Sequence, residues 1–104
     1  MNQIPKAGRV YLYAIPINMR WGDRKLKELC RKEMGIDPLD GDVFVFFNSK
    51  KDQLKLFFLD ATGSQELHKM LPKGGFLVPL PNEGEKFVSL NKSKLNSLFR
   101  TDLF

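Results

Sequence analysis

Cys30 and His68 are the residue types that most readily form a nucleophile and its base. They are the only cysteine and the only histidine among the 104 residues. A thiolate–imidazole pair needs a third group to orient the imidazole, and no local motif marks such a group. One cysteine also excludes an intramolecular disulfide and any zinc or iron–sulfur site built from several cysteines. We therefore expect no cofactor.

The carboxylates are the next candidates for chemistry, because paired Asp or Glu side chains serve as acids, bases or metal ligands. Several of the twelve Asp and Glu residues lie in turn sequences, namely Asp37, Asp40, Asp42, Asp52 and Asp60. A short polar side chain caps or closes a bend at such positions. The first three lack the twelve-residue spacing and terminal Glu of an EF-hand. The sequence therefore predicts turn roles, no metal site and no enzyme activity.

The basic residues are more suggestive than the acidic ones. There are 17 Lys and Arg against 12 Asp and Glu, a formal net charge of +5. Residues 1–36 contain eight of the basic side chains and only three of the acidic ones, so the positive excess lies in the first third. Such an excess favours encounters with anionic partners and says nothing about the fold.

Two local patterns place cations where a nucleic acid can reach them. Lys50 and Lys51 lie between two apolar runs, at the expected tip of a hairpin. Arg20 and Arg24 flank Trp21, a combination that suits phosphate contact with aromatic stacking. Each pattern has a plainer interpretation, in which the lysines solubilise a turn and Trp21 packs over the core. The candidate phosphate contacts are Arg9, Arg20, Arg24, Arg31, Lys50, Lys51, Lys55 and Lys69.

The elements that position these residues can be predicted from periodicity. Residues 9–15 are rich in β-branched and aromatic types and end before Pro16, which predicts a strand. From Asp23 to Met34 apolar residues recur at three- and four-residue steps, and Gly35 follows. This spacing predicts an amphipathic helix that ends at the glycine.

Two apolar runs, residues 43–47 and 54–59, are joined by a short polar segment and predict a β-hairpin. Each run is apolar on both of its alternating faces, so both faces of the hairpin must be covered. Either helices pack on opposite sides, or one face contacts another chain. We favour coverage by helices.

The C-terminal part is less regular. Residues 65–71 form either a third hairpin strand or an irregular extension. Residues 76–78 are predicted as a short strand that stops at Pro79, and residues 87–90 are brief and extended. Asn91 is typical of a helix N-cap, and Leu95, Leu98 and Phe99 then share one helix face. We predict a single α+β domain over residues 1–104: a small antiparallel sheet or meander with an early helix and a C-terminal helix.

Colinear blocks from about residue 8 to residue 100 resemble a bacterial family, the TnpB or Orf2-like accessory proteins of IS66 insertion sequences. The blocks are residues 8–12, 18–22, 41–46, 50–56, 60–63, 69–71, 76 and 88–90. Arg20, Gly22 and Lys55 match the family pattern directly, whereas positions 21, 53 and 70 are neutral where the family is usually basic. The resemblance implies a non-catalytic role in transposition, with element DNA, the transposase and other accessory subunits as partners.

Three hypotheses remain open at this point. The first is an accessory protein that binds DNA or helps to assemble the transposase complex. The second is a protein-interaction module that docks the transposase through a Phe-rich sheet face containing Phe44, Phe46 and Phe57. The third is an enzyme that uses Cys30 or clustered Asp. No apolar run approaches the roughly 20 residues of a membrane span and no signal segment is evident, so we expect a cytoplasmic protein without a membrane partner.

Overall fold

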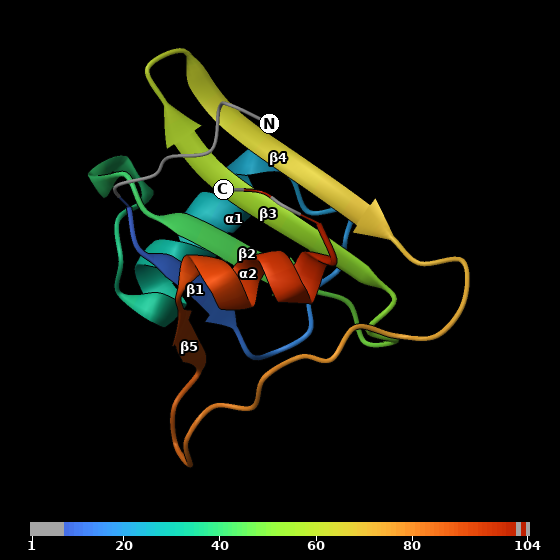
Figure 1. The fold of residues 1–104 in the computed structure, drawn as a ribbon. Coiled ribbons are helices and arrows are strands. Elements are labelled where there is room, and N and C mark those ends of the chain that lie inside the picture. Colours follow the sequence, from blue (N-terminus) through green and yellow to red (C-terminus); the bar gives the residue numbers. More distant parts are fainter. Residues whose placement is uncertain (1–7, 102, 104) are drawn as a thin grey trace.

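A five-stranded sheet forms the centre of the computed structural model, which describes residues 8–101 and 103 (Figure 1). The strands are β1 (Val10–Tyr13), β2 (Val43–Phe47), β3 (Gln53–Asp60), β4 (Gly63–Met70) and β5 (Phe87–Leu90). Their order across the sheet is β4-β3-β2-β1-β5. The expected hairpin is β2 and β3, with Phe44 opposite Phe57. Residues 65–71, whose pattern left two interpretations open, belong almost entirely to strand β4.

The sheet is mixed, which corrects the expectation of a purely antiparallel arrangement. β1 and β2 run parallel, with Val10 opposite Val43, whereas the other three pairs are antiparallel. Parallel neighbours need a long crossover, and residues 14–42 provide one that contains the early helix. The α+β class, with an early helix and a C-terminal helix, is confirmed.

The early helix changes its winding along its length. It begins as α1 (Asp23–Leu29), continues as a π-helical segment, η1 (Cys30–Met34), and ends at Gly35, whose φ of 69° is left-handed. A short 3₁₀ turn, η2 (Pro38–Asp40), precedes β2. The C-terminal helix is α2 (Lys92–Phe99), and the Lys94 backbone N–H donates to Asn91 Oδ1 at 2.7 Å, as an N-cap requires.

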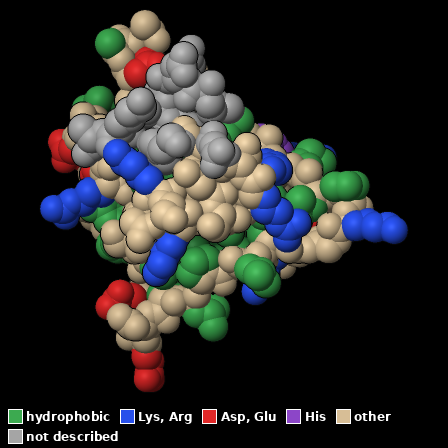
Figure 2. All heavy atoms as spheres, in the orientation of Figure 1, with side chains coloured by type: hydrophobic (Ala, Val, Ile, Leu, Met, Phe, Trp, Pro, Cys, Tyr) green, Lys and Arg blue, Asp and Glu red, His purple; other side chains and the backbone are tan. Residues whose placement is uncertain are grey.

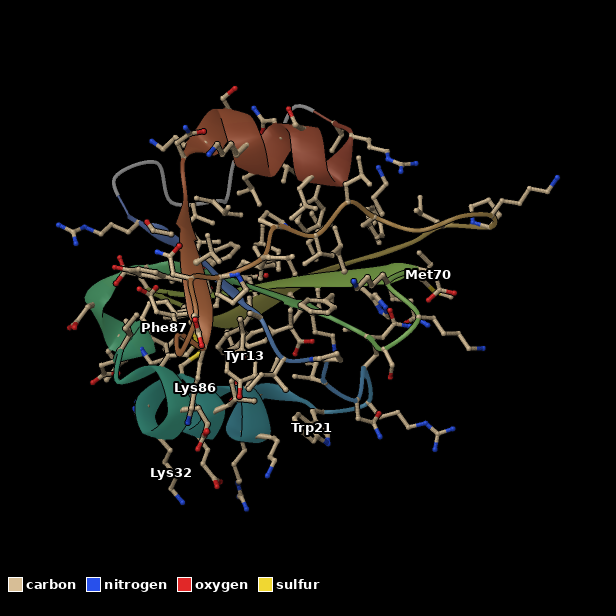
Figure 3. All side chains as sticks on the ribbon, turned by 90° about the horizontal axis from the view of Figure 1, so that it is seen from below. Tyr13, Trp21, Lys32, Met70, Lys86 and Phe87 are labelled. Atoms are coloured by element: carbon tan, nitrogen blue, oxygen red, sulfur yellow. The ribbon has the colours of Figure 1, made fainter. Side chains whose placement is uncertain are left out.

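Helices cover both faces of the sheet, as we expected from the all-apolar hairpin (Figures 1 and 3). Leu26 of α1 and Cys30 of η1 pack with one set of sheet side chains. Leu95 and Phe99 of α2 pack with the alternate set. Successive residues of a strand point to opposite faces, so β2 and β3 contribute to both clusters. The fully buried side chains of the first cluster include Phe44, Phe46 and Phe57.

Residues 71–86 form a long loop around the outside of the sheet (Figure 1). Phe76 is buried on the α2 side, and its N–H donates to the Lys51 carbonyl oxygen at 2.7 Å. The strand predicted over residues 76–78 is wrong, because no other described strand pairs with this segment. Pro79 and Pro81 lack the N–H that a ladder needs. None of the helices in the described part of the chain is long and apolar enough to cross a membrane.

Candidate nucleic-acid interface

Four segments meet at the end of the sheet where β2 stops and β3 starts. The loop before α1 is tied to β2 by the Ile17 N–H, which donates to the Phe47 carbonyl at 2.8 Å. The loop after β4 is tied to the turn after β2 by the Leu71 N–H, which donates to the Asp52 carbonyl at 2.8 Å. The end of α2 joins them through Arg100, whose guanidinium donates to the Gly75 carbonyl at 3.1 Å.

Exposed cations gather where these segments meet. We call this set the basic end: Arg20, Lys50, Lys51, Lys73 and Arg100. None of the five forms an ion pair with a carboxylate of residues 8–101. Figure 3 shows nitrogen-tipped side chains pointing outward around the end of the molecule that carries Met70. The structure thus brings together three of the candidate phosphate contacts and two cations that the sequence analysis missed.

The turn that carries Lys50 and Lys51 is held by Asn48. Asn48 Oδ1 accepts from the backbone N–H groups of Asp52 and Gln53 at 3.1 and 3.0 Å. Asn48 Nδ2 donates to the Asp52 carboxylate at 2.7 Å. This carboxylate is therefore engaged within the turn. Lys51 itself has a φ of 58°, a left-handed conformation that costs a residue with a Cβ about 1 kcal/mol.

A shallow hollow of about 670 Å³ connects the loop before α1 with this turn. Arg20 lines one side, and Asn48, Ser49, Gln53 and His68 line the other. His68 Nε2 lies 2.8 Å from Gln53 Oε1, so the imidazole is oriented by an amide. The hollow offers hydrogen-bonding groups beside the basic end.

The opposite end of the sheet is acidic, and its carboxylates serve the turns as predicted. Asp42 Oδ1 accepts from the Arg9 N–H at 3.0 Å, so candidate Arg9 lies at this end. Hydrogen bonds from the Leu39 N–H and the Arg31 guanidinium lower the pKa of Asp37. Bonds from the Thr62 hydroxyl and N–H lower the pKa of Asp60. In Figure 2 red and blue side chains alternate along the left margin, whereas the right-hand tip is blue.

The outer surface of α1 and η1 carries charges of both signs. Lys27 pairs with Asp23 at 3.0 Å and Lys32 pairs with Glu28 at 3.2 Å. Arg31 pairs with Asp37 at 3.2 Å. Candidate Arg24 is exposed on this surface, among these pairs. Because carboxylates interrupt it, the surface does not form a continuous basic stripe with the basic end.

A model of the family described as "IS66 Orf2 like protein" matches residues 8–101. The chain belongs to this family. It is also 30% identical over 81 residues to "Uncharacterized protein y4jC" of Sinorhizobium fredii, covering 78% of this chain and 69% of that protein. A second protein of that organism, "Uncharacterized protein y4hO", is 31% identical over 81 residues, or 78% of this chain and 70% of its own length. No solved structure matches.

Membership confirms the resemblance seen in the sequence blocks and gives the Orf2-like protein an accessory role in insertion-sequence transposition.

Lys55 corrects the set of candidate phosphate contacts. Its side chain is buried, with 5% of the residue exposed, and Nζ donates to the carbonyl oxygens of Met19 and Trp21 at 2.7 and 3.1 Å. Glu66 Oε1 lies 3.2 Å from the same nitrogen. The ammonium of Lys55 thus fixes the loop before α1 and cannot reach a phosphate. Lys69 is half-buried and donates to the Phe99 carbonyl at the C-terminal end of α2.

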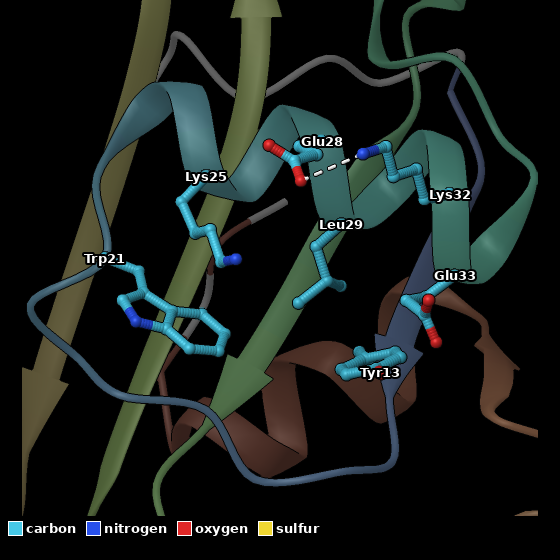
Figure 4. A pocket seen from close by; sticks show the side chains of 7 residues that line it. All are labelled: Tyr13, Trp21, Lys25, Glu28, Leu29, Lys32 and Glu33. Carbon is cyan, nitrogen blue, oxygen red and sulfur yellow. Dashed lines mark hydrogen bonds and ion pairs between the residues drawn. The ribbon is translucent and has the colours of Figure 1, made fainter.

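Trp21 packs over the core, which is the plainer of the two interpretations given above. It packs against the core cluster on the α1 side, and Lys25 Nζ lies 5.1 Å from the centroid of its ring. Figure 4 shows Trp21 and Tyr13 on opposite sides of a hollow of about 250 Å³ beside α1. The indole is therefore a packing residue, and Arg20 next to it remains exposed.

The groups considered for catalysis do not converge. Cys30 is fully buried, and burial raises the pKa of its thiol to about 12. His68 is exposed on β4 and bonds to Gln53. Within residues 8–101 and 103, no group of three or more His, Cys, Asp or Glu side chains could hold a metal ion.

The two missed members of the basic end gave little signal in the sequence. Lys73 lies in a Pro-Lys-Gly-Gly turn and Arg100 at the end of α2, each more than 20 residues from Lys51 along the chain. Only the contacts of residues 71–76 with the hairpin turn and with Arg100 bring them there. Local patterns do not encode such contacts.

Proposed function

We propose that this Orf2-like protein is a non-catalytic accessory protein that holds element DNA at its basic end while the transposase complex assembles. One observation carries this proposal: cations from four separate segments gather at one end of the sheet, without a carboxylate partner among the described residues. Exposed cations without a carboxylate partner can replace the counterions that surround a phosphate backbone.

The type of side chain indicates how the DNA is held. Lys and Arg contacts to phosphates position a protein on DNA without reading the sequence. We therefore expect weak sequence preference and a steep dependence on salt. If all five cations contact phosphates, log K falls with log salt at a slope of about −4.5.

Two double variants with the same net charge test the location of the contact. Lys50→Glu/Lys51→Glu reverses charge at the basic end. Arg9→Glu/Arg24→Glu reverses it at two exposed candidates elsewhere, so both variants carry a net charge four units below the natural protein. Fluorescence anisotropy with a duplex from the end of an element should show an at least roughly tenfold loss for the first variant and at most about a threefold loss for the second.

The salt series adds a second readout. The slope of log K against log salt should become shallower by about 2 for Lys50→Glu/Lys51→Glu. Equal losses in the two variants would mean that net charge alone matters. Absence of binding at about 50 mM salt would overturn direct DNA contact.

The alternative hypothesis, in which the transposase docks on the Phe-rich sheet face, has no exposed surface to support it. The rings of Phe44, Phe46 and Phe57 are 0% exposed beneath α1 and η1. A docking surface needs side chains that a partner can touch. Any protein contact must therefore use another surface.

A further inference from the structure

Leu77 and Leu80 stand out among the apolar side chains because they face solvent. They are 89% and 84% exposed, whereas Val78 between them packs against the α2-side core. The core therefore holds the backbone of this segment but makes no use of the two leucines.

The segment around these leucines is restrained on both sides. Phe76 is buried before it, and the rings of Pro79 and Pro81 limit the backbone to φ near −65°. A restrained segment loses little conformational entropy when a partner binds, which favours binding. The two leucines are thus presented in a defined arrangement.

A groove of about 230 Å³ separates this segment from α2. Leu77 and Pro79 form one wall, and Lys94, Ser97, Leu98 and Arg100 form the other. Its volume is below the 300–1,000 Å³ typical of small-molecule sites. It suits one or two side chains of a protein segment better than a cofactor.

The charged residues that line the groove have one sign. Every charged residue in segments 71–81 and 92–100 is Lys or Arg. Of these, Lys94 and Arg100 line the groove directly and are exposed. A complementary occupant carries carboxylates next to its apolar side chains.

We propose that the groove between residues 77–79 and α2, together with the exposed Leu80 beside it, docks a partner protein through a segment that has apolar side chains flanked by Asp or Glu. The proposal does not depend on DNA contact. It gives the accessory protein a second surface, which shares only Arg100 with the basic end, so that one molecule can hold DNA at the basic end and a protein segment beside α2.

The test uses a phage library that displays random 12-residue peptides, selected against the full chain. Peptides that bind should contain at least two apolar residues and a net negative charge. A synthetic peptide from the selection should bind at least roughly tenfold more weakly to Leu77→Ser/Leu80→Ser and to Lys94→Glu. The matched control is Leu39→Ser, because Leu39 is a 71% exposed leucine at the opposite end of the sheet; it should bind the peptide normally.

Three results would overturn the proposal. The first is that no selected peptide depends on Leu77 and Leu80 for binding, and the second is that the selected peptides are neutral or basic. The third is a dimer in sedimentation that Leu77→Ser/Leu80→Ser dissociates, which would assign the groove to a second copy of the chain. The DNA assay on Leu77→Ser/Leu80→Ser separates the two proposals, since DNA affinity should be unchanged in this variant.

Discussion

Lys55 and Lys69 direct their ammonium groups to backbone carbonyls, whereas Lys50 and Lys51 direct theirs to solvent. All four were equivalent in the sequence as candidate phosphate contacts. The difference arises from the partners that the fold provides, the carbonyls of Met19 and Trp21 for Lys55 and that of Phe99 for Lys69. At the scale of single residues, charge alone does not identify a binding residue.

Substitution of Lys55 should therefore affect stability. Lys55→Ala removes two hydrogen bonds from a buried ammonium and should lower the free energy of unfolding by about 2–3 kcal/mol. Lys50→Ala, at an exposed position, should change it by less than about 0.5 kcal/mol. Urea denaturation monitored by circular dichroism measures both values. If the two variants were equally stable, Lys55 would not anchor the loop before α1.

The turn between β2 and β3 contains a lysine, Lys51, in an unfavourable backbone conformation. Lys51 adopts a left-handed φ of 58°, a conformation that glycine adopts more easily. A lysine at this position keeps a cation at the basic end in spite of that cost. This is the arrangement expected where a side chain serves binding more than stability.

Two substitutions of Lys51 separate the backbone from the charge. Lys51→Gly and Lys51→Ala both remove the ammonium, but only glycine relieves the left-handed conformation. Lys51→Gly should be about 1 kcal/mol more stable than Lys51→Ala in thermal or urea unfolding. The two variants should lose DNA affinity equally. A larger loss of affinity for one of them would show that turn conformation, and not charge, governs the contact.

At the scale of the whole molecule, one sheet supports two core clusters. β2 and β3 contribute alternate side chains to the α1 side and to the α2 side, so neither cluster can form without the same strands. Because the strands are shared, we expect the two faces to unfold together.

A destabilising substitution on one face of the sheet should consequently shift the unfolding transition reported by a probe on the other face. Leu95 is fully buried on the α2 side, whereas Trp21, the only tryptophan, packs on the α1 side. Leu95→Ala should lower the free energy of unfolding by about 2–5 kcal/mol. Trp21 fluorescence and far-ultraviolet circular dichroism should report the same shifted urea midpoint. A Trp21 transition that stays in place while the circular dichroism transition moves would show two independent units.

The sequence by itself determined the elements with strong local periodicity. These elements are the hairpin of residues 43–47 and 54–59, the helix that ends at Gly35 and the helix capped by Asn91. They indicated the α+β fold class, and the colinear blocks indicated the family. Each depends on neighbours within a few residues, which a pattern can reveal.

Only the tertiary structure decided which charges lie close together. The parallel pairing of β1 with β2, the packing of residues 71–76 on the hairpin turn and the burial of Lys55 are all contacts between distant segments. They gather Lys73 and Arg100 beside Lys51 and remove Lys55 from the surface. Local patterns cannot specify these outcomes, because the energy of a charge depends on the partners and the solvent around it in the folded chain.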